Sequence, residues 1–172
     1  MEGSRRRKRQ VKRFLRKVKL SWIIKGILYI LGIYAFFYTM HQYEITLISI
    51  SSLLTIGITG GILVSLILER KLKYYLFSII LFGSLCTAVF FWINREFSGS
   101  HEIKLHQRIL YKALASPKVE HSRVTIAYDN YMKDIGIAHD EEYNVDSASF
   151  IILTVHRGGL GHYIISGTEL AK

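Results

Sequence analysis

The sequence predicts a membrane protein of three transmembrane helices followed by a small external α+β domain, with one helix and then about four antiparallel strands. Three observations lead to this prediction. Long apolar blocks lie between Leu20 and Asn94, basic residues crowd the N-terminus, and polarity becomes ordinary after Asn94. We therefore divide the chain into a basic arm (1–20), a transmembrane domain (21–95) and an external domain (96–172).

The apolar blocks are long enough to cross a bilayer, because about 20 apolar residues span about 30 Å of hydrocarbon. The predicted spans cover about 22–40, 45–68 and 74–94, and the second and third contain no charged residue. A core helix of a soluble protein would keep a polar face. The first block follows a basic stretch, as in a signal peptide, but it is too long and has a poor cleavage site after Met40, which favours an anchor.

The orientation follows from lysine and arginine in the short flanking segments. The arm is strongly basic, the segment 41–44 has no Lys or Arg, and the segment 69–73 has three. This alternation predicts a cytoplasmic N-terminus and an extracytoplasmic C-terminal domain. In a bacterium with two membranes, the protein would lie in the inner membrane with this domain in the periplasm.

Small residues recur on the second and third spans at spacings that let helix backbones approach closely. The simpler interpretation is a three-helix bundle within one chain, and the alternative is a dimer face. No ionisable residue lies in the middle of a span, which argues against a transporter or a proton relay. The predicted helix-packing residues are Gly57, Gly61, Ser65, Gly83 and Thr87.

The basic arm predicts a juxtamembrane amphipathic helix that contacts anionic lipid, since each basic residue near such a surface contributes about 1 kcal/mol. Enforcing topology alone and binding a partner are the alternatives. Residues 95–172 hold nine Lys or Arg and ten Asp or Glu, so the overall charge of +10 does not indicate that this domain binds nucleic acid. The predicted lipid-binding residues are Arg5, Arg6, Arg7, Lys8, Arg9, Lys12, Arg13, Arg16, Lys17 and Lys19.

The external domain is expected to begin with a helix over Gly99–Ser116, ended by Pro117 because the residue before proline avoids helical geometry. Alternating β-branched and apolar residues then predict strands. A turn at Asp129-Asn130 joins the first two, although a helical turn over 132–135 is an alternative to the second. The acidic segment 139–149 is expected to be a loop. The predicted strands are 123–128, 131–137, 149–156 and 162–166.

Six of the seven histidines lie in the external domain, and His156 and His162 bracket the glycine-rich segment 157–161. Together with His139, or with an acidic residue of the segment 140–142, these two could supply three ligands to a zinc ion. The spacing matches no established metal motif, so surface or interface histidines are the other interpretation. The glycines join two predicted strands, which indicates a hairpin turn and not a phosphate-binding loop.

The sequence contains no catalytic signature, and we expect neither enzymatic activity nor a cofactor. We expect the external β-rich domain to bind another protein of the cell envelope, or a second copy of the chain, while the arm contacts anionic lipid. A metal-binding or metal-sensing membrane protein that uses the histidines is the alternative.

Overall fold

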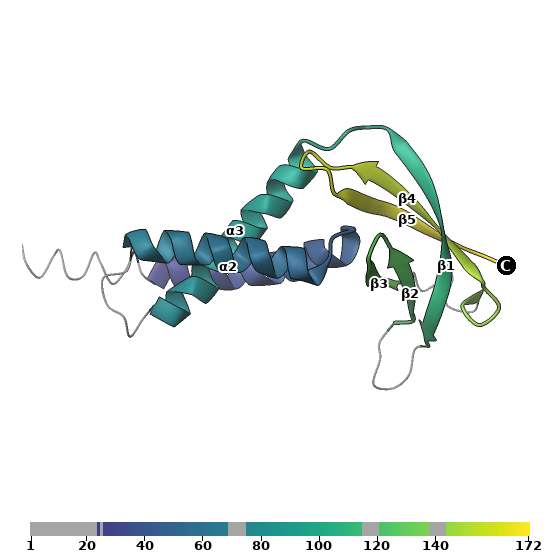
Figure 1. Cartoon of the computed structure of the whole chain (residues 1–172), viewed down its shortest axis with the longest axis horizontal. Coiled ribbons are helices and arrows are strands. Elements are labelled where there is room, and N and C mark those ends of the chain that lie inside the picture. Colours follow the sequence, from purple (N-terminus) through teal and green to yellow (C-terminus); the bar gives the residue numbers. More distant parts are fainter. Residues whose placement is uncertain (1–23, 25, 69–74, 115–120, 138–143) are drawn as a thin grey trace, which may run out of the picture.

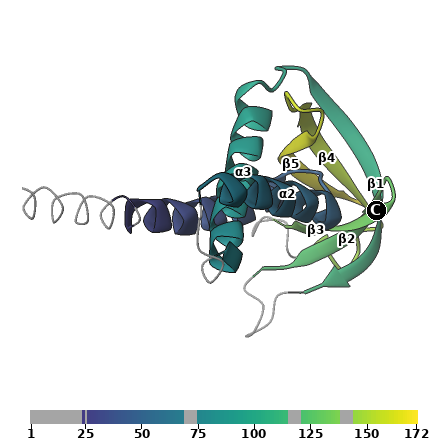
Figure 2. The same cartoon turned by 60° about the vertical axis from the view of Figure 1, so that its left-hand side comes forward.

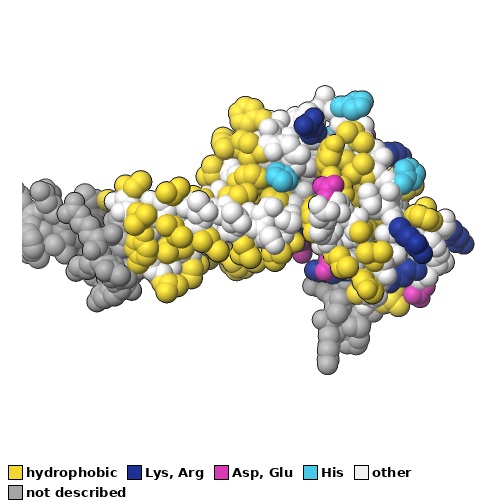
Figure 3. All heavy atoms as spheres, in the orientation of Figure 1, with side chains coloured by type: hydrophobic (Ala, Val, Ile, Leu, Met, Phe, Trp, Pro, Cys, Tyr) yellow, Lys and Arg dark blue, Asp and Glu magenta, His cyan; other side chains and the backbone are white. Residues whose placement is uncertain are grey.

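The computed structural model describes residues 24, 26–68, 75–114, 121–137 and 144–172. Within this part, three helices precede a five-stranded antiparallel sheet that curls beyond one end of them (Figures 1 and 2). Two helical segments, Ile50–Ile67 and Tyr75–Glu96, are long and apolar enough to cross a membrane. Many of their side chains are apolar and exposed, Ile67 by 81% and Leu76 by 74%, and apolar surface dominates the helical part in Figure 3. Membrane association is thus supported by two of the three predicted spans.

The first helix includes residues 26–45, so the segment 41–44, which was expected to be a loop, is helical. The turn toward the next helix comes later because the chain after this helix joins the sheet. Thr46 forms an isolated bridge with Ile164, and the Leu47 N–H donates a hydrogen bond of 2.8 Å to the Tyr163 carbonyl. The connection between the helices is therefore part of the junction with the external domain.

Helix α2 (Ile50–Leu68) begins five residues later than the predicted start at Ile45. Ser49 caps it, because its hydroxyl accepts a hydrogen bond of 3.1 Å from the Ser52 N–H. A serine at this position satisfies one of the unpaired amides of the first helical turn. The remaining 19 residues still suffice for a span of about 28 Å at about 1.5 Å per residue.

Helix α3 (Tyr75–Glu96) packs closely against α2 through glycines. A Cβ added to Gly83 would lie 2.7 Å from the carbonyl oxygen of Gly57, and one added to Gly61 would collide with the backbone of Ile79. Thr87 of α3 reaches the first helix, since its hydroxyl lies 3.1 Å from that of Thr39. The helices of one chain thus contact each other at small residues, which let their backbones approach closely.

Strand β1 (Glu102–Ala113) replaces the helix that was predicted over Gly99–Ser116, and that prediction was wrong. The apolar residues of this segment fit a helical face, but its first half also alternates strictly. Ile103, Leu105 and Ile109 are packed in the domain core, while Lys104, His106 and Arg108 between them are exposed. An irregularity between Ile109 and Tyr111 shifts the register and breaks the alternation. Pairing on both edges of β1 outweighs its weak helical pattern.

The sheet has the strand order β3-β2-β1-β4-β5, and every neighbouring pair is antiparallel. Four of its five strands correspond to the four predicted ones, and the segment after the Asp129-Asn130 turn is a strand, not a helical turn. The last strand extends past Ser166. Ser166 is the extra residue of a bulge opposite Thr154 and Val155, and pairing with β4 continues from Gly167 onward. The bounds are β2 Arg123–Tyr128, β3 Tyr131–Gly136, β4 Phe150–Arg157 and β5 Tyr163–Ala171.

The core of the external domain is a cluster of buried apolar side chains from the strands of the curled sheet. Side chains from β1 to β4 meet there, and Leu47 from the connection between the first two helices enters the same cluster. The fully buried members include Val124, Ile126, Ile151, Leu153 and Val155. One apolar side chain from the helical part thus completes the core of the sheet.

Candidate functional site

The external domain is fixed to the ends of the helices through Asn94 in the last turns of α3. This side chain is 1% exposed. Its amide donates a hydrogen bond of 3.1 Å to the His162 carbonyl and accepts one of 3.1 Å from the Leu160 N–H. The Asn94 carbonyl accepts a bond of 2.9 Å from the Gly159 N–H. A side chain at Gly158 would collide with the Asn94 amide, so this glycine lets the β4–β5 turn approach the helix.

A second connection joins β3 to the end of the first helix through Lys133, whose side chain is 1% exposed. Its ammonium group donates a hydrogen bond to the Tyr43 carbonyl and lies 3.4 Å from the centroid of the Tyr43 ring. Burial lowers the pKa of Lys133 to about 8, although the carboxylates of Glu44 and Asp134 act in the opposite direction. A cation is favourable at a helix C-terminus, where carbonyl groups lack helical partners.

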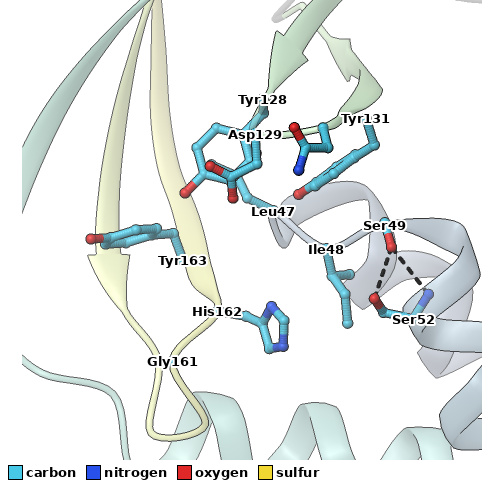
Figure 4. Close-up of a pocket in the computed structure, with 11 residues that line it drawn as sticks. Leu47, Ile48, Ser49, Ser52, Tyr128, Asp129, Tyr131, Gly161, His162 and Tyr163 are labelled. Atoms are coloured by element: carbon cyan, nitrogen blue, oxygen red, sulfur yellow. Dashed lines mark hydrogen bonds between the residues drawn. The ribbon is translucent and has the colours of Figure 1, made fainter.

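Between these two connections lies a cavity of about 360 Å³ (Figure 4). The β2–β3 turn, the β4–β5 turn and the start of α2 each supply part of its wall. Figure 4 shows Tyr128, Asp129 and Tyr131 extending from their turn toward Leu47 and Ile48, with His162 and Tyr163 on the opposite side. The lining residues are Leu47, Ile48, Ser49, Ser52, Tyr128, Asp129, Asn130, Tyr131, Gly161, His162 and Tyr163.

Hydroxyl groups and one carboxylate dominate the polar chemistry of the cavity. Burial raises the pKa of Tyr128, and the nearby Asp129 and Tyr163 raise it further. Burial also raises the pKa of Tyr131, with smaller contributions from Tyr128, Asp129 and Tyr43. The phenols of Tyr128 and Tyr131 are therefore neutral at physiological pH. The Tyr131 hydroxyl is buried and finds no hydrogen-bond partner within the described segments.

The predicted metal ligands are not brought together in the part of the chain that the structure describes. His156 lies opposite Ile164 in the register and its Nε2 is 3.7 Å from a carboxylate oxygen of Glu102. His162 packs against Phe90 of α3, with ring centroids 5.5 Å apart. No group of three His, Cys, Asp or Glu suited to a metal ion occurs among the described residues. His139 lies outside them, so the three-ligand site stays a prediction.

The other predicted site residues divide into two groups. All ten lipid-binding residues of the arm lie outside the described residues, so their contact with lipid stays a prediction. The predicted helix-packing residues lie along α2 and α3. Gly57, Gly61, Gly83 and Thr87 lie at contacts between helices. Ser65 is fully buried, and its hydroxyl has no hydrogen-bond partner among the residues that the structure describes.

Comparison with known proteins gives no family model, no curated protein and no solved structure that matches this chain. The candidate site therefore has to be interpreted from its own residues.

Sequence reasoning missed the residues that build the junction and the cavity. Asn94 is a polar residue at the end of an apolar span, and a residue of this kind is typical of an ordinary span boundary. Lys133 is a single basic residue in an otherwise ordinary strand. The segment Tyr128-Asp129-Asn130-Tyr131 carried the clearest signal, since two aromatic residues flank a tight turn, but its distance from the start of α2 along the chain concealed the cavity.

Proposed function

We propose that this chain is a multi-pass membrane protein whose external domain binds another protein rather than catalysing a reaction. In this proposal the three predicted spans cross a bacterial inner membrane, the N-terminus is cytoplasmic and the sheet lies in the periplasm. Two apolar helices and the basic flanks support the membrane part. The connections through Asn94 and Lys133 support a domain held in a fixed position above the bilayer.

The observation that carries the binding function is an exposed apolar surface at the β1 bulge. Ile109 faces the core, whereas the next two residues, Leu110 and Tyr111, are 42% and 64% exposed. Bulges redirect side chains in this way. Phe150 on β4 and Met132 on β3 are also exposed on strands of the same sheet. Aromatic and methionine side chains are typical of the centre of a protein interface.

Photocrosslinking in cells tests this proposal. A photoreactive amino acid at Tyr111 should give a discrete crosslinked product, with an envelope protein or with a second copy of the chain. The matched control is His106, which is exposed on the same strand. Equal crosslinking at the two positions, or none at Tyr111, would contradict the proposal. Light scattering in detergent would separate self-association from binding of a different protein.

The proposed topology has an independent test. A reporter that is active only in the periplasm should be active when fused after Lys172 and inactive when inserted at Lys71. The reverse pattern would refute the proposed orientation.

The proposed role of the arm predicts that vesicles with anionic lipid retain the full chain better than neutral vesicles do. Added salt should weaken this difference, because it screens exposed charges.

A further inference from the structure

The tyrosine-lined cavity lies at the level where α2 would enter the membrane. Its wall includes Ser49 and Ser52, and the apolar segment suited to a membrane span begins at Ile50 between them. Leu47 and Ile48, which are 2% and 1% exposed, also border the cavity. In a membrane, this position corresponds to the lipid headgroups, where polar and apolar groups meet. The volume of about 360 Å³ is at the lower end of ligand-binding pockets.

The chemistry of the wall favours a cation. Asp129 supplies a carboxylate, and Tyr128, Tyr131 and Tyr163 supply aromatic rings with phenolic oxygens. No Lys or Arg is among the lining residues, and within the described segments Asp129 has no ion-pair partner. The nearest buried cation on the same hairpin, Lys133, is directed to Tyr43. Aromatic rings and a carboxylate together attract an ammonium group more strongly than either does alone.

We propose that this cavity binds the primary ammonium group of a phosphoethanolamine headgroup that belongs to a membrane phospholipid. A primary ammonium has three N–H donors. The Asp129 carboxylate, the Asn130 side-chain carbonyl and the phenolic oxygens are acceptors for them. A lipid is favoured as the carrier over a free amine because the cavity adjoins the first turn of an apolar helix that could cross the membrane.

The decisive variant is Asp129→Asn. Asp129 has a φ of +48°, in the left-handed region, and asparagine tolerates this conformation as well as aspartate does. The variant therefore removes the charge and keeps the turn. Asp146→Asn is the matched control, since it removes one exposed carboxylate from the same domain outside the cavity.

The experiment uses the full chain in detergent, titrated with short-chain phosphatidylethanolamine, with short-chain phosphatidylglycerol and with free O-phosphoethanolamine. Thermal unfolding and native mass spectrometry record binding. We expect phosphatidylethanolamine to stabilise the wild type and the Asp146→Asn control, and to bind Asp129→Asn about tenfold more weakly, because a charge-assisted hydrogen bond is lost. Phosphatidylglycerol should not reproduce the Asp129-dependent effect.

Equal responses to the two lipids, or an unchanged response of Asp129→Asn, would overturn the proposal. A response to free O-phosphoethanolamine without one to the lipid would overturn the assignment to a lipid. The protein-binding function proposed above depends on the exposed apolar surface at Tyr111, which is not among the residues that line the cavity, so crosslinking at Tyr111 and lipid binding at Asp129 can fail independently.

Discussion

The ammonium group of Lys133 lies 3.4 Å from the centroid of the Tyr43 ring and donates a hydrogen bond to the Tyr43 carbonyl. This pair joins β3 to the end of the first helix, two elements that are about 90 residues apart in sequence. The ammonium group contacts a carbonyl oxygen and an aromatic face, but burial removes its hydrating water. The lowered pKa of Lys133 shows that the loss of water is the larger effect on its charge.

Lys133 should make the stability of the protein rise with pH in the weakly alkaline range. Its pKa falls from 10.5 to about 8 on folding, so between these values the unfolded chain binds one proton more than the folded one. The cost of burying the charge is fully present below pH 8 and is relieved as the pH rises above it. Between pH 7 and 9.5, the unfolding temperature should rise more steeply with pH for the wild type than for Lys133→Met.

The slope with pH, not the unfolding temperature itself, is the readout for Lys133. Lys104→Met is the control, because the Lys104 side chain is 60% exposed and its removal should leave the slope unchanged. The Tyr43 ring faces Lys133, but burial raises the pKa of Tyr43, so this phenol stays protonated in this range. The carboxylates of Glu44 and Asp134 favour the charged form of Lys133, and burial outweighs them. Equal slopes for wild type and Lys133→Met would show that Lys133 does not titrate there.

Asn94→Ala should loosen the β4–β5 turn from the end of α3. The substitution removes both side-chain hydrogen bonds of Asn94 and leaves the His162 carbonyl and the Leu160 amide without these partners. Each buried group that loses its partner costs about 1–3 kcal/mol. Hydrogen exchange should accelerate at Leu160 and neighbouring amides. Asn144→Ala, at an exposed position in another loop, should leave that exchange rate unchanged.

The contrast between Ser149–His156 and Gly99–Ser116 shows which features the sequence alone could predict. The first segment is dense in β-branched residues and forms β4 within a residue of its predicted bounds. The second fits both a strand and a helix, and only pairing with β2 and β4 decides in favour of β1. The local residue pattern was sufficient to predict the strand at β4, where it was unambiguous. At β1 the pattern was ambiguous, and pairing with distant strands decided the secondary structure.

The candidate site depended entirely on long-range relationships. Asp129 is separated by about 80 residues from Ser49, and His162 by about 70 from Phe90, yet all four contribute to one region of the junction. The curl of the sheet brings these turns to the ends of the helices (Figure 1). Residue types and sequence spacing carry no information on that curl, so the cavity could not be predicted.

Leu47→Ala should destabilise the external domain, although Leu47 lies between two helices in sequence. Its side chain is 2% exposed and belongs to the core cluster of the sheet. Truncating a buried leucine costs about 2–5 kcal/mol, because apolar contact is lost and a cavity remains. Leu54→Ala is the matched control, since Leu54 on α2 is 55% exposed. Chemical denaturation followed by near-ultraviolet circular dichroism should detect a loss of stability for Leu47→Ala alone.

Gly83→Ala should weaken the packing of α3 against α2, whereas Gly26→Ala in the first helix should not. A methyl group at position 83 would lie 2.7 Å from the Gly57 carbonyl oxygen, and backbone cannot yield as a flexible side chain can. At position 26 the methyl group meets no atom of the described residues within 4 Å. Alanine favours a helix over glycine by about 1 kcal/mol, so this control should be neutral or slightly stabilising. Thermal unfolding in detergent should show a lower unfolding temperature for Gly83→Ala and an unchanged or slightly higher one for Gly26→Ala. A similar effect of both would mean that α2 and α3 do not need their close backbone contact.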